Sequence, residues 1–237
     1  MTPAEGAYYL GVPNIVMVSY GNKPSPPFEK YALALSSLKR VVWSIAGAVD
    51  CTENNEVVLV CDLATRFTNI CGVIMDDFFR RDKPNGKVAV YTLEELKAIQ
   101  GKLKASEHKL DLWVVLYNRD LLANLFVKEY LEYCDVVTYW TWQAKNIENL
   151  EQSFERVEKI SPFSRKVLGC YMYDYGDKKP MPVSLMEKQC HLGLRWLQEG
   201  RIEGMIFLAS CICDVGLEAV EWTRQWIQKL EEKTQNE

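Results

Sequence analysis

Seven apolar runs, each followed by a helical pattern, constrain the fold of this chain more than any other feature. The runs lie at residues 14–20, 40–47, 71–77, 112–118, 135–142, 167–176 and 204–211. Strands that alternate with helices at this spacing predict βαβ units and a parallel sheet. The segment 3–10 is predicted to be a short helix with no strand before it, and Thr92 with Glu95 predicts a capped helix start.

Two α/β architectures fit this alternation. One is a doubly wound open sheet, and the other is a (β/α)8 barrel of the TIM type whose first strand is missing. Aromatic and polar residues end nearly every run, which favours a barrel with one shared mouth, since an open sheet concentrates its site at one switch point. We therefore predict a single barrel domain over residues 1–237, either naturally shortened or N-terminally incomplete.

Composition narrows the classes of partner. The 237 residues carry a net charge of −4, with no interleaving of basic and aromatic residues, which argues against nucleic acid. No apolar run approaches the roughly 20 residues of a membrane helix, and the start of the chain lacks a signal-peptide pattern. Of the eight cysteines, Cys71, Cys170 and Cys211 lie inside apolar runs, as buried reduced thiols do. We expect a cytoplasmic protein, or a secreted one if the chain is a fragment.

The third run ends in two carboxylates. It reads Cys71-Gly-Val-Ile-Met-Asp-Asp-Phe-Phe79, so Asp76 and Asp77 follow a strand that has no polar face. Side chains alternate along a strand, so we expect one acid to enter the mouth and the other to brace a loop or cap a helix. Tyr173 and Asp174 stand likewise at the end of a later run, where they either belong to the site or form hydrogen bonds with groups of a loop.

The other strand ends supply aromatic and amide side chains. The candidates for contact with a ligand are Tyr20, Trp43, Tyr117, Asn118, Trp140, Trp142 and Tyr171. Flat indole rings at the mouth suit sugar rings, and packing in the core is the alternative for each tryptophan.

Absences restrict the chemistry. The two histidines fall in or beside helices, no lysine lies inside a strand, and no phosphate-binding glycine motif is present. These patterns disfavour a histidine-rich metal site, a Schiff base and a nucleotide cofactor, so we expect no metal and no cofactor. Two carboxylates that flank a glycosidic bond need none of these groups.

Two short runs resemble the strand ends of glycoside-hydrolase (β/α) barrels: Gly72-Val-Ile-Met-Asp-Asp77 and Tyr171-Met-Tyr-Asp174. The second is similar to the Met-x-Tyr-Asp strand of chitinase-like barrels, with Tyr171 where the methionine stands. Chitinase-like enzymes also carry an Asp-x-x-Asp-x-Asp-x-Glu strand whose final Glu is the acid. Here Phe78, Phe79 and two arginines follow Asp77, so no Glu stands at that spacing. The resemblance implies a carbohydrate-active barrel outside the chitinase pattern.

The predicted function is acid–base cleavage of a glycosidic bond. Asp76 or Asp77 supplies one carboxylate and Asp174 the other, while Tyr173 orients or stabilises. Two alternatives stay open: a non-catalytic or truncated barrel that binds a carbohydrate or a partner, and a lyase or hydrolase that holds Mg²⁺ on Asp76, Asp77 and Asp174.

Overall fold

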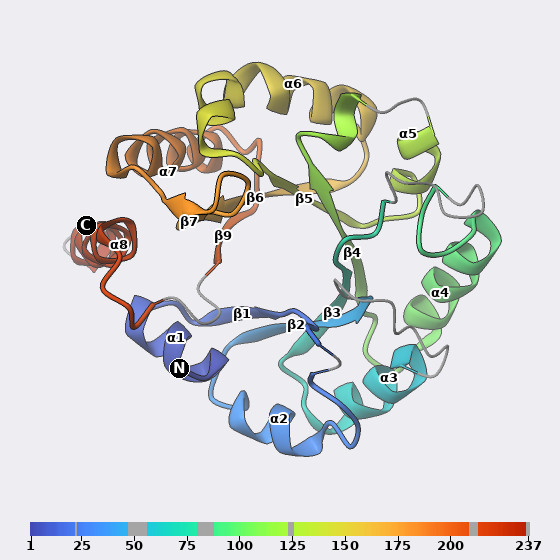
Figure 1. Ribbon diagram of the computed structural model, residues 1–237. Coiled ribbons are helices and arrows are strands. Elements are labelled where there is room, and N and C mark those ends of the chain that lie inside the picture. The colour runs from blue at the N-terminus through green and yellow to red at the C-terminus, as the bar shows by residue number, and fades with distance from the viewer. Residues whose placement is uncertain (22, 47–55, 80–87, 123–125, 209–212, 236–237) are drawn as a thin grey trace.

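Seven parallel strands form the inner layer of a (β/α) barrel (Figure 1). The computed structural model describes residues 1–21, 23–46, 56–79, 88–122, 126–208 and 213–235. The strands pair in the order β1-β2-β3-β4-β5-β6-β9, each parallel to its neighbour. Their bounds are β1 Asn14–Met17, β2 Arg40–Ala46, β3 Ile70–Met75, β4 Asp111–Tyr117, β5 Val136–Trp140, β6 Arg165–Tyr171 and β9 Gly204–Leu208. Among the described residues no ladder joins β9 to β1, so the barrel is nearly closed and lacks one strand.

In the described part of the chain, eight α-helices surround the strands (Figure 1). They are α1 Pro3–Leu10, α2 Glu29–Ala34, α3 Glu56–Arg66, α4 Leu93–Ala105, α5 Phe126–Leu131, α6 Leu150–Ile160, α7 Val183–Gln198 and α8 Glu218–Gln235. Strands covered on both faces are continuously apolar, and β5 is buried at every position. The predicted helix start at Thr92 is confirmed, because the Thr92 hydroxyl accepts from the Glu95 N–H at 3.2 Å and the Glu95 carboxylate accepts from the Thr92 N–H at 2.7 Å.

Several predicted strands end earlier than expected, the runs 14–20 and 167–176 by the most. The run 14–20 ends at Met17, and Tyr20 lies instead in a turn that bridges to Lys23. The run 167–176 breaks at Met172: β6 ends at Tyr171, and Tyr173–Asp174 form β7 of an antiparallel hairpin with β8, Lys179–Pro180. The run 204–211 is a strand as far as Leu208, and its remainder lies outside the described residues.

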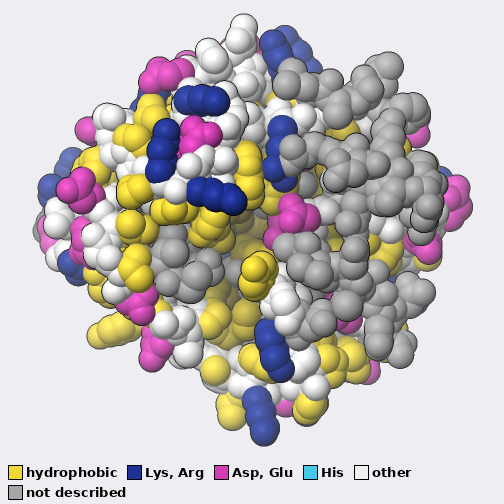
Figure 2. Space-filling view, in the orientation of Figure 1, with side chains coloured by type: hydrophobic (Ala, Val, Ile, Leu, Met, Phe, Trp, Pro, Cys, Tyr) yellow, Lys and Arg dark blue, Asp and Glu magenta, His cyan; other side chains and the backbone are white. Residues whose placement is uncertain are grey.

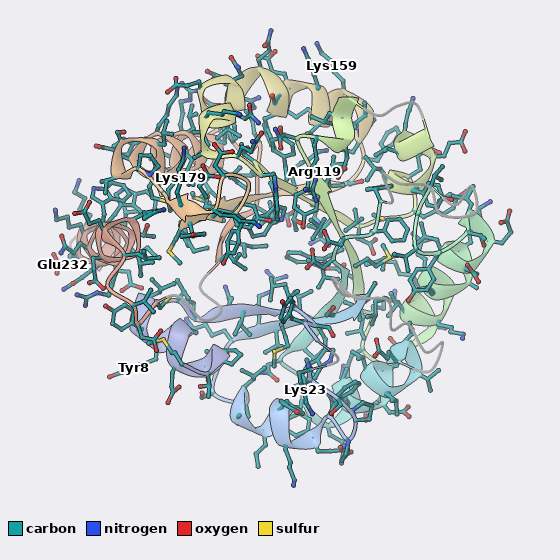
Figure 3. The ribbon with its side chains drawn as sticks, in the orientation of Figure 1. Tyr8, Lys23, Arg119, Lys159, Lys179 and Glu232 are labelled. Atoms are coloured by element: carbon teal, nitrogen blue, oxygen red, sulfur yellow. The ribbon has the colours of Figure 1, made fainter. Side chains whose placement is uncertain are left out.

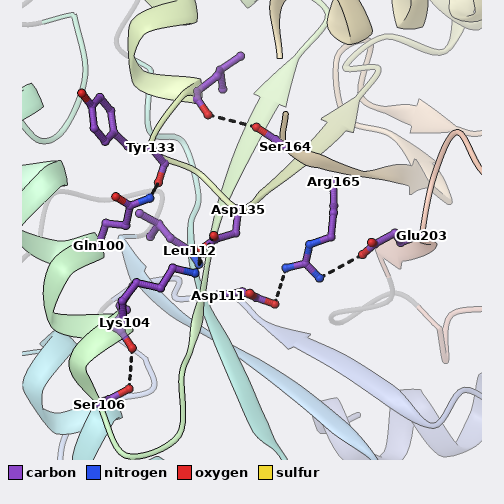
Figure 4. Close-up of polar contacts among 12 residues, drawn as sticks. Gln100, Lys104, Ser106, Asp111, Leu112, Tyr133, Asp135, Ser164, Arg165 and Glu203 are labelled. Carbon is purple, nitrogen blue, oxygen red and sulfur yellow. Dashed lines mark hydrogen bonds and ion pairs between the residues drawn. The ribbon is translucent and has the colours of Figure 1, made fainter. Parts of the chain in front are cut away.

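The amino ends of the strands are fastened by ion pairs (Figure 4). Arg165, the first residue of β6, lies 2.6 Å from Asp111 of β4 and 3.2 Å from Glu203, which precedes β9. Asp135, before β5, pairs with Lys104 of α4 at 2.7 Å. These contacts join several βα units at the end where barrels keep stabilising residues, and the opposite end is left for chemistry.

Candidate functional site

Asp76 lies at the carboxyl end of β3 and lines a cavity of about 500 Å³ inside the barrel. The same cavity is lined by Tyr117 of β4, Trp140 of β5 and Tyr171 of β6. The view along the barrel in Figure 2 shows a hollow near the middle of this face, with hydrophobic side chains inside it and charged side chains close to its edge. Asp76 therefore faces a partly enclosed space with aromatic walls.

The environment of Asp76 favours its protonated form. Its Oδ1 accepts a hydrogen bond from the Tyr117 hydroxyl at 3.2 Å and another from the Asp77 N–H at 2.9 Å. Both bonds favour the carboxylate, but burial and then the charge of Asp77 outweigh them and raise the pKa of Asp76 to about 6. A carboxyl group with this pKa can hold a proton near neutral pH and release it to a substrate.

The environment of Asp77 differs from that of Asp76. Its backbone is left-handed, with φ of 45°, so the chain turns sharply directly after Asp76. The Asp77 side chain is 38% exposed, and its Oδ1 lies 3.9 Å from the Arg119 guanidinium. One acid thus enters the cavity, while its neighbour lies at the rim beside an arginine.

Arg119 was not among the residues selected from the sequence. Its guanidinium carbon lies 4.3 Å from the centre of the Tyr117 ring and 4.4 Å from that of Trp142, so two aromatic rings hold it. Figure 3 shows Arg119 on the inner side of the ring of helices. Tyr175, also not selected, stacks on Trp142 at 6.2 Å. The available signal was position, since Arg119 follows Tyr117 by two residues just beyond a strand end.

Trp140 and Tyr171 form the wall beyond Tyr117. Their ring centres are 4.8 Å apart, and the Trp140 indole N–H donates to the Thr138 hydroxyl at 2.9 Å. The indole lies over Gly169 of the neighbouring strand, where a methyl group would come within 2.0 Å of the ring. Burial also raises the pKa of Tyr171, so its phenol is neutral at physiological pH.

Asp174 and Tyr173 belong to the β7–β8 hairpin. The Asp174 side chain is buried, with 1% exposure, and its Oδ1 accepts from the Asp177 N–H at 3.1 Å within the hairpin. Its Oδ2 is buried and has no hydrogen-bond partner among the described atoms. Tyr173 is half-buried and packs against Tyr175 at 5.3 Å. Asp174 therefore has one oxygen committed to its own loop.

Three other residues that were predicted to contact a ligand lie in environments that differ from one another. Trp43 is fully buried and packs against Phe28 in the core, so its ring is not accessible to a ligand. Tyr20 is 76% exposed in its turn. Asn118 is half-buried, and its Oδ1 accepts from the Trp142 N–H at 3.1 Å, which ties the end of β4 to the end of β5.

The three aspartates do not form a metal site. Within the part of the chain that the structure describes, no three His, Cys, Asp or Glu side chains are grouped so as to hold an ion. The set of Asp76, Asp77 and Asp174 proposed for Mg²⁺ is therefore not assembled. None of the described helices has the length and apolar character needed to cross a bilayer.

Known proteins resemble this chain in structure but not detectably in sequence. No protein-family model and no curated protein sequence match the chain. Among solved structures, active domain 2 of a thermostable chitinase from Pyrococcus furiosus superposes with a TM-score of 0.63 at 12% identity, covering 99% of this chain and 91% of that one. The glycoside hydrolase domain of PgaB from Bordetella bronchiseptica gives a TM-score of 0.53 at 11% identity over 86% of both chains. A xylanase–α-amylase inhibitor protein in complex with trehalose gives 0.58 at 10% identity, covering 94% and 93%.

These likenesses establish the fold. The described part of the chain is a (β/α) barrel with seven strands in its sheet, similar in fold to these domains, and Asp76 at the carboxyl end of β3 lines its cavity.

Proposed function

We propose that this protein is a carbohydrate-active hydrolase in which Asp76 donates a proton to the leaving oxygen of a glycosidic bond. The observation that carries the proposal is the pKa of Asp76, which burial raises to about 6 in an aromatic-walled cavity at a strand end. Glycosidases commonly use a carboxylic acid with a raised pKa as the proton donor. The fold of the structural neighbours supports this reading.

We assign the second carboxylate to Asp77 rather than to Asp174. Asp77 is partly exposed at the rim and close enough to Asp76 for its charge to raise the pKa of that acid. Asp174 is buried, and one of its oxygens is committed to the hairpin. In this assignment Arg119, held by Tyr117 and Trp142, orients Asp77, while Tyr117, Trp140 and Tyr171 contact the sugar.

The test is hydrolysis of a panel of oligosaccharides that contain N-acetylhexosamine, glucuronic acid or xylose. Asp76→Asn should lower kcat by about 10²–10⁴-fold, the usual contribution of a positioned acid. The loss should be smaller for aryl glycosides, whose leaving groups need little protonation. Asp62→Asn, an exposed carboxylate on α3, is the matched control and should leave kcat unchanged. Equal activity of Asp76→Asn and the parent on natural oligosaccharides would end the assignment.

A second candidate is carbohydrate or protein binding without catalysis. It is favoured by one specific observation: the inhibitor protein bound to trehalose shares this fold over 94% of the present chain. Saturable binding of an oligosaccharide by calorimetry, with no cleavage of it after prolonged incubation, would select this candidate.

A further inference from the structure

Arg119 is fixed at the mouth of the barrel by the turn that carries it. This turn directly follows β4, and it is fastened on both sides of the arginine. The Asn118 N–H donates to the Trp140 carbonyl at 2.8 Å, and the Asp120 carboxylate accepts from the Tyr117 N–H at 2.9 Å. The side chain of Arg119 therefore starts from a backbone position that hydrogen bonds hold in place.

Two aromatic rings then fix the guanidinium itself. Tyr117 and Trp142 meet edge to face, with ring centres 5.8 Å apart and an angle of 82° between their planes. The guanidinium carbon of Arg119 lies 4.3 Å from one ring centre and 4.4 Å from the other. An arginine that is held in this way loses little further conformational entropy when a ligand binds to it.

The guanidinium has hydrogen-bond donors that the described residues do not use. The Nε–H of Arg119 is buried and has no partner among the described atoms. The ion pair with Asp77 is long, because its N···O distance is 3.9 Å and hydrogen bonds between charged groups are about 2.7–2.9 Å. The arginine side chain is still 23% exposed, so a ligand can reach it. A rigid cation at a cavity mouth with unused donors is the arrangement expected of a binding site for an anion.

Tyr117 connects this arginine to the candidate acid. The Tyr117 hydroxyl donates to Asp76 at 3.2 Å, and the Arg119 guanidinium lies over the ring of the same tyrosine. A sugar whose glycosidic oxygen reaches Asp76 therefore lies beside Arg119 as well. In a pyranose, the ring oxygen joins the anomeric carbon to C5, which bears C6. A charged group at C6 can thus meet the guanidinium while the anomeric carbon stays at Asp76.

The charges at the mouth are compatible with an anionic ligand. Burial raises the pKa of Asp76 to about 6, so this acid is neutral in the form that donates a proton. The charge of Asp77 opposes an anion, but the Arg119 guanidinium at 3.9 Å offsets it. The protonated acid and the ion pair together leave the donors of Arg119 available to a substrate.

We propose that Arg119 binds the anionic group of an acidic sugar, a uronate carboxylate or a sulfate ester, beside the bond that Asp76 cleaves. The inference rests on the proposed function and adds the class of substrate to it, an acidic rather than a neutral carbohydrate. A planar guanidinium matches either anion through two parallel hydrogen bonds, which the ammonium group of a lysine does not reproduce. Arg119 thus orients Asp77 and also selects the substrate.

The test is a binding measurement that needs no turnover. Every form of the protein carries Asp76→Asn, and α- and β-linked oligosaccharides are compared in sets that differ only at C6: glucuronic acid, glucose and glucose 6-sulfate. Calorimetry should give a Kd for an acidic set at least about tenfold lower than for the neutral one, which corresponds to about 1.4 kcal/mol. The glucuronic acid and 6-sulfate sets distinguish the two anions.

Variants of Arg119 locate this preference. Adding Arg119→Gln should reduce it to about twofold or less, and Arg119→Lys should keep only part of it because the paired hydrogen bonds are lost. Lys179→Gln is the matched control, since it removes the same charge from an exposed residue at this end of the barrel that pairs with Asp177 at 3.4 Å. This control should keep the full preference. Circular dichroism establishes that each variant is folded.

Three results would overturn the inference: equal affinity for acidic and neutral sets, no binding of any set, or a preference that survives Arg119→Gln. An equal loss of affinity for all sets in Arg119→Gln belongs to the third result, because the arginine then only positions Asp77. Failure of the proposed function looks different. If the parent protein cleaves none of these compounds while Asp76→Asn keeps an Arg119-dependent preference, the acidic-sugar site stands and the hydrolase proposal is wrong.

Discussion

Gly169→Ala should destabilise the protein by displacing Trp140. A methyl group at Gly169 would lie 2.0, 2.2 and 2.5 Å from three atoms of the indole, whereas carbon atoms in good contact are about 3.5–4.0 Å apart. The ring must therefore move by about 1.5 Å, and its hydrogen bond to Thr138 is strained or lost. Overpacking and the weakened hydrogen bond together cost about 2–4 kcal/mol of unfolding free energy.

The assays are urea unfolding for the free energy and thermal unfolding for Tm, both followed by circular dichroism, which does not depend on the fluorescence of the displaced indole. At about 2–4 °C per kcal/mol for a chain of this size, Tm should fall by about 5–15 °C. Gly101→Ala is the control: its methyl group meets nothing within 4 Å in helix α4, so this variant should gain about 0.5–1 kcal/mol. In a double variant that also carries Trp140→Leu, the loss of unfolding free energy should be smaller than the sum of the losses in the two single variants. A Gly169→Ala variant within about 0.5 kcal/mol of the parent would refute the close packing of ring on backbone.

Three further predictions concern titratable groups. The pKa of Asp76 is raised from 3.8 to about 6, so its contribution to the unfolding free energy is complete below pH 4 and is lost as the pH rises through 6. Thermal melts over this pH range should show a loss of up to about 3 kcal/mol. The same loss should be absent in Asp76→Asn. Tyr117→Phe removes a hydrogen bond that favours the Asp76 carboxylate, so the pKa of Asp76 should rise further. In pH–rate profiles, the pH at which hydrolysis declines should therefore move upward. An unchanged or lower value would contradict the contact. Burial raises the thiol pKa of Cys134, Cys170 and Cys190. These three thiols should therefore react with a thiol reagent only after the protein unfolds. Rapid labelling of the native protein would show instead that the barrel opens locally.

Much of the architecture was predictable because burial leaves a local signature. Strands covered on both faces must be apolar at consecutive positions, as in the run from Ile70 to Met75, and the amphipathic helices between them repeat at a different period. The prediction of seven parallel strands in a barrel that lacks one strand follows from these patterns and is confirmed for the described sheet. The errors lie at strand ends, where Met172 separates β6 from a hairpin that the apolar pattern of 167–176 concealed.

The site was only partly predictable, because the burial and contacts of its side chains depend on residues from several different strands. The sequence placed Asp76 at a strand end, but its raised pKa comes first from burial, which depends on how the neighbouring strands pack around it. Trp43 has the same sequence setting as Trp140, yet its ring lies in the core while that of Trp140 lines the cavity.

By itself, the sequence determined the class of fold, the order of its elements and the strand end that carries the acids, since each depends on the hydrophobic pattern of a local segment. Only the tertiary structure decided which of two adjacent aspartates enters the cavity, that two aromatic rings hold Arg119, and that the barrel is open between its first and last strands. These features depend on the direction of side chains across strands far apart in the chain, and that direction is set by the closing of the sheet around one axis.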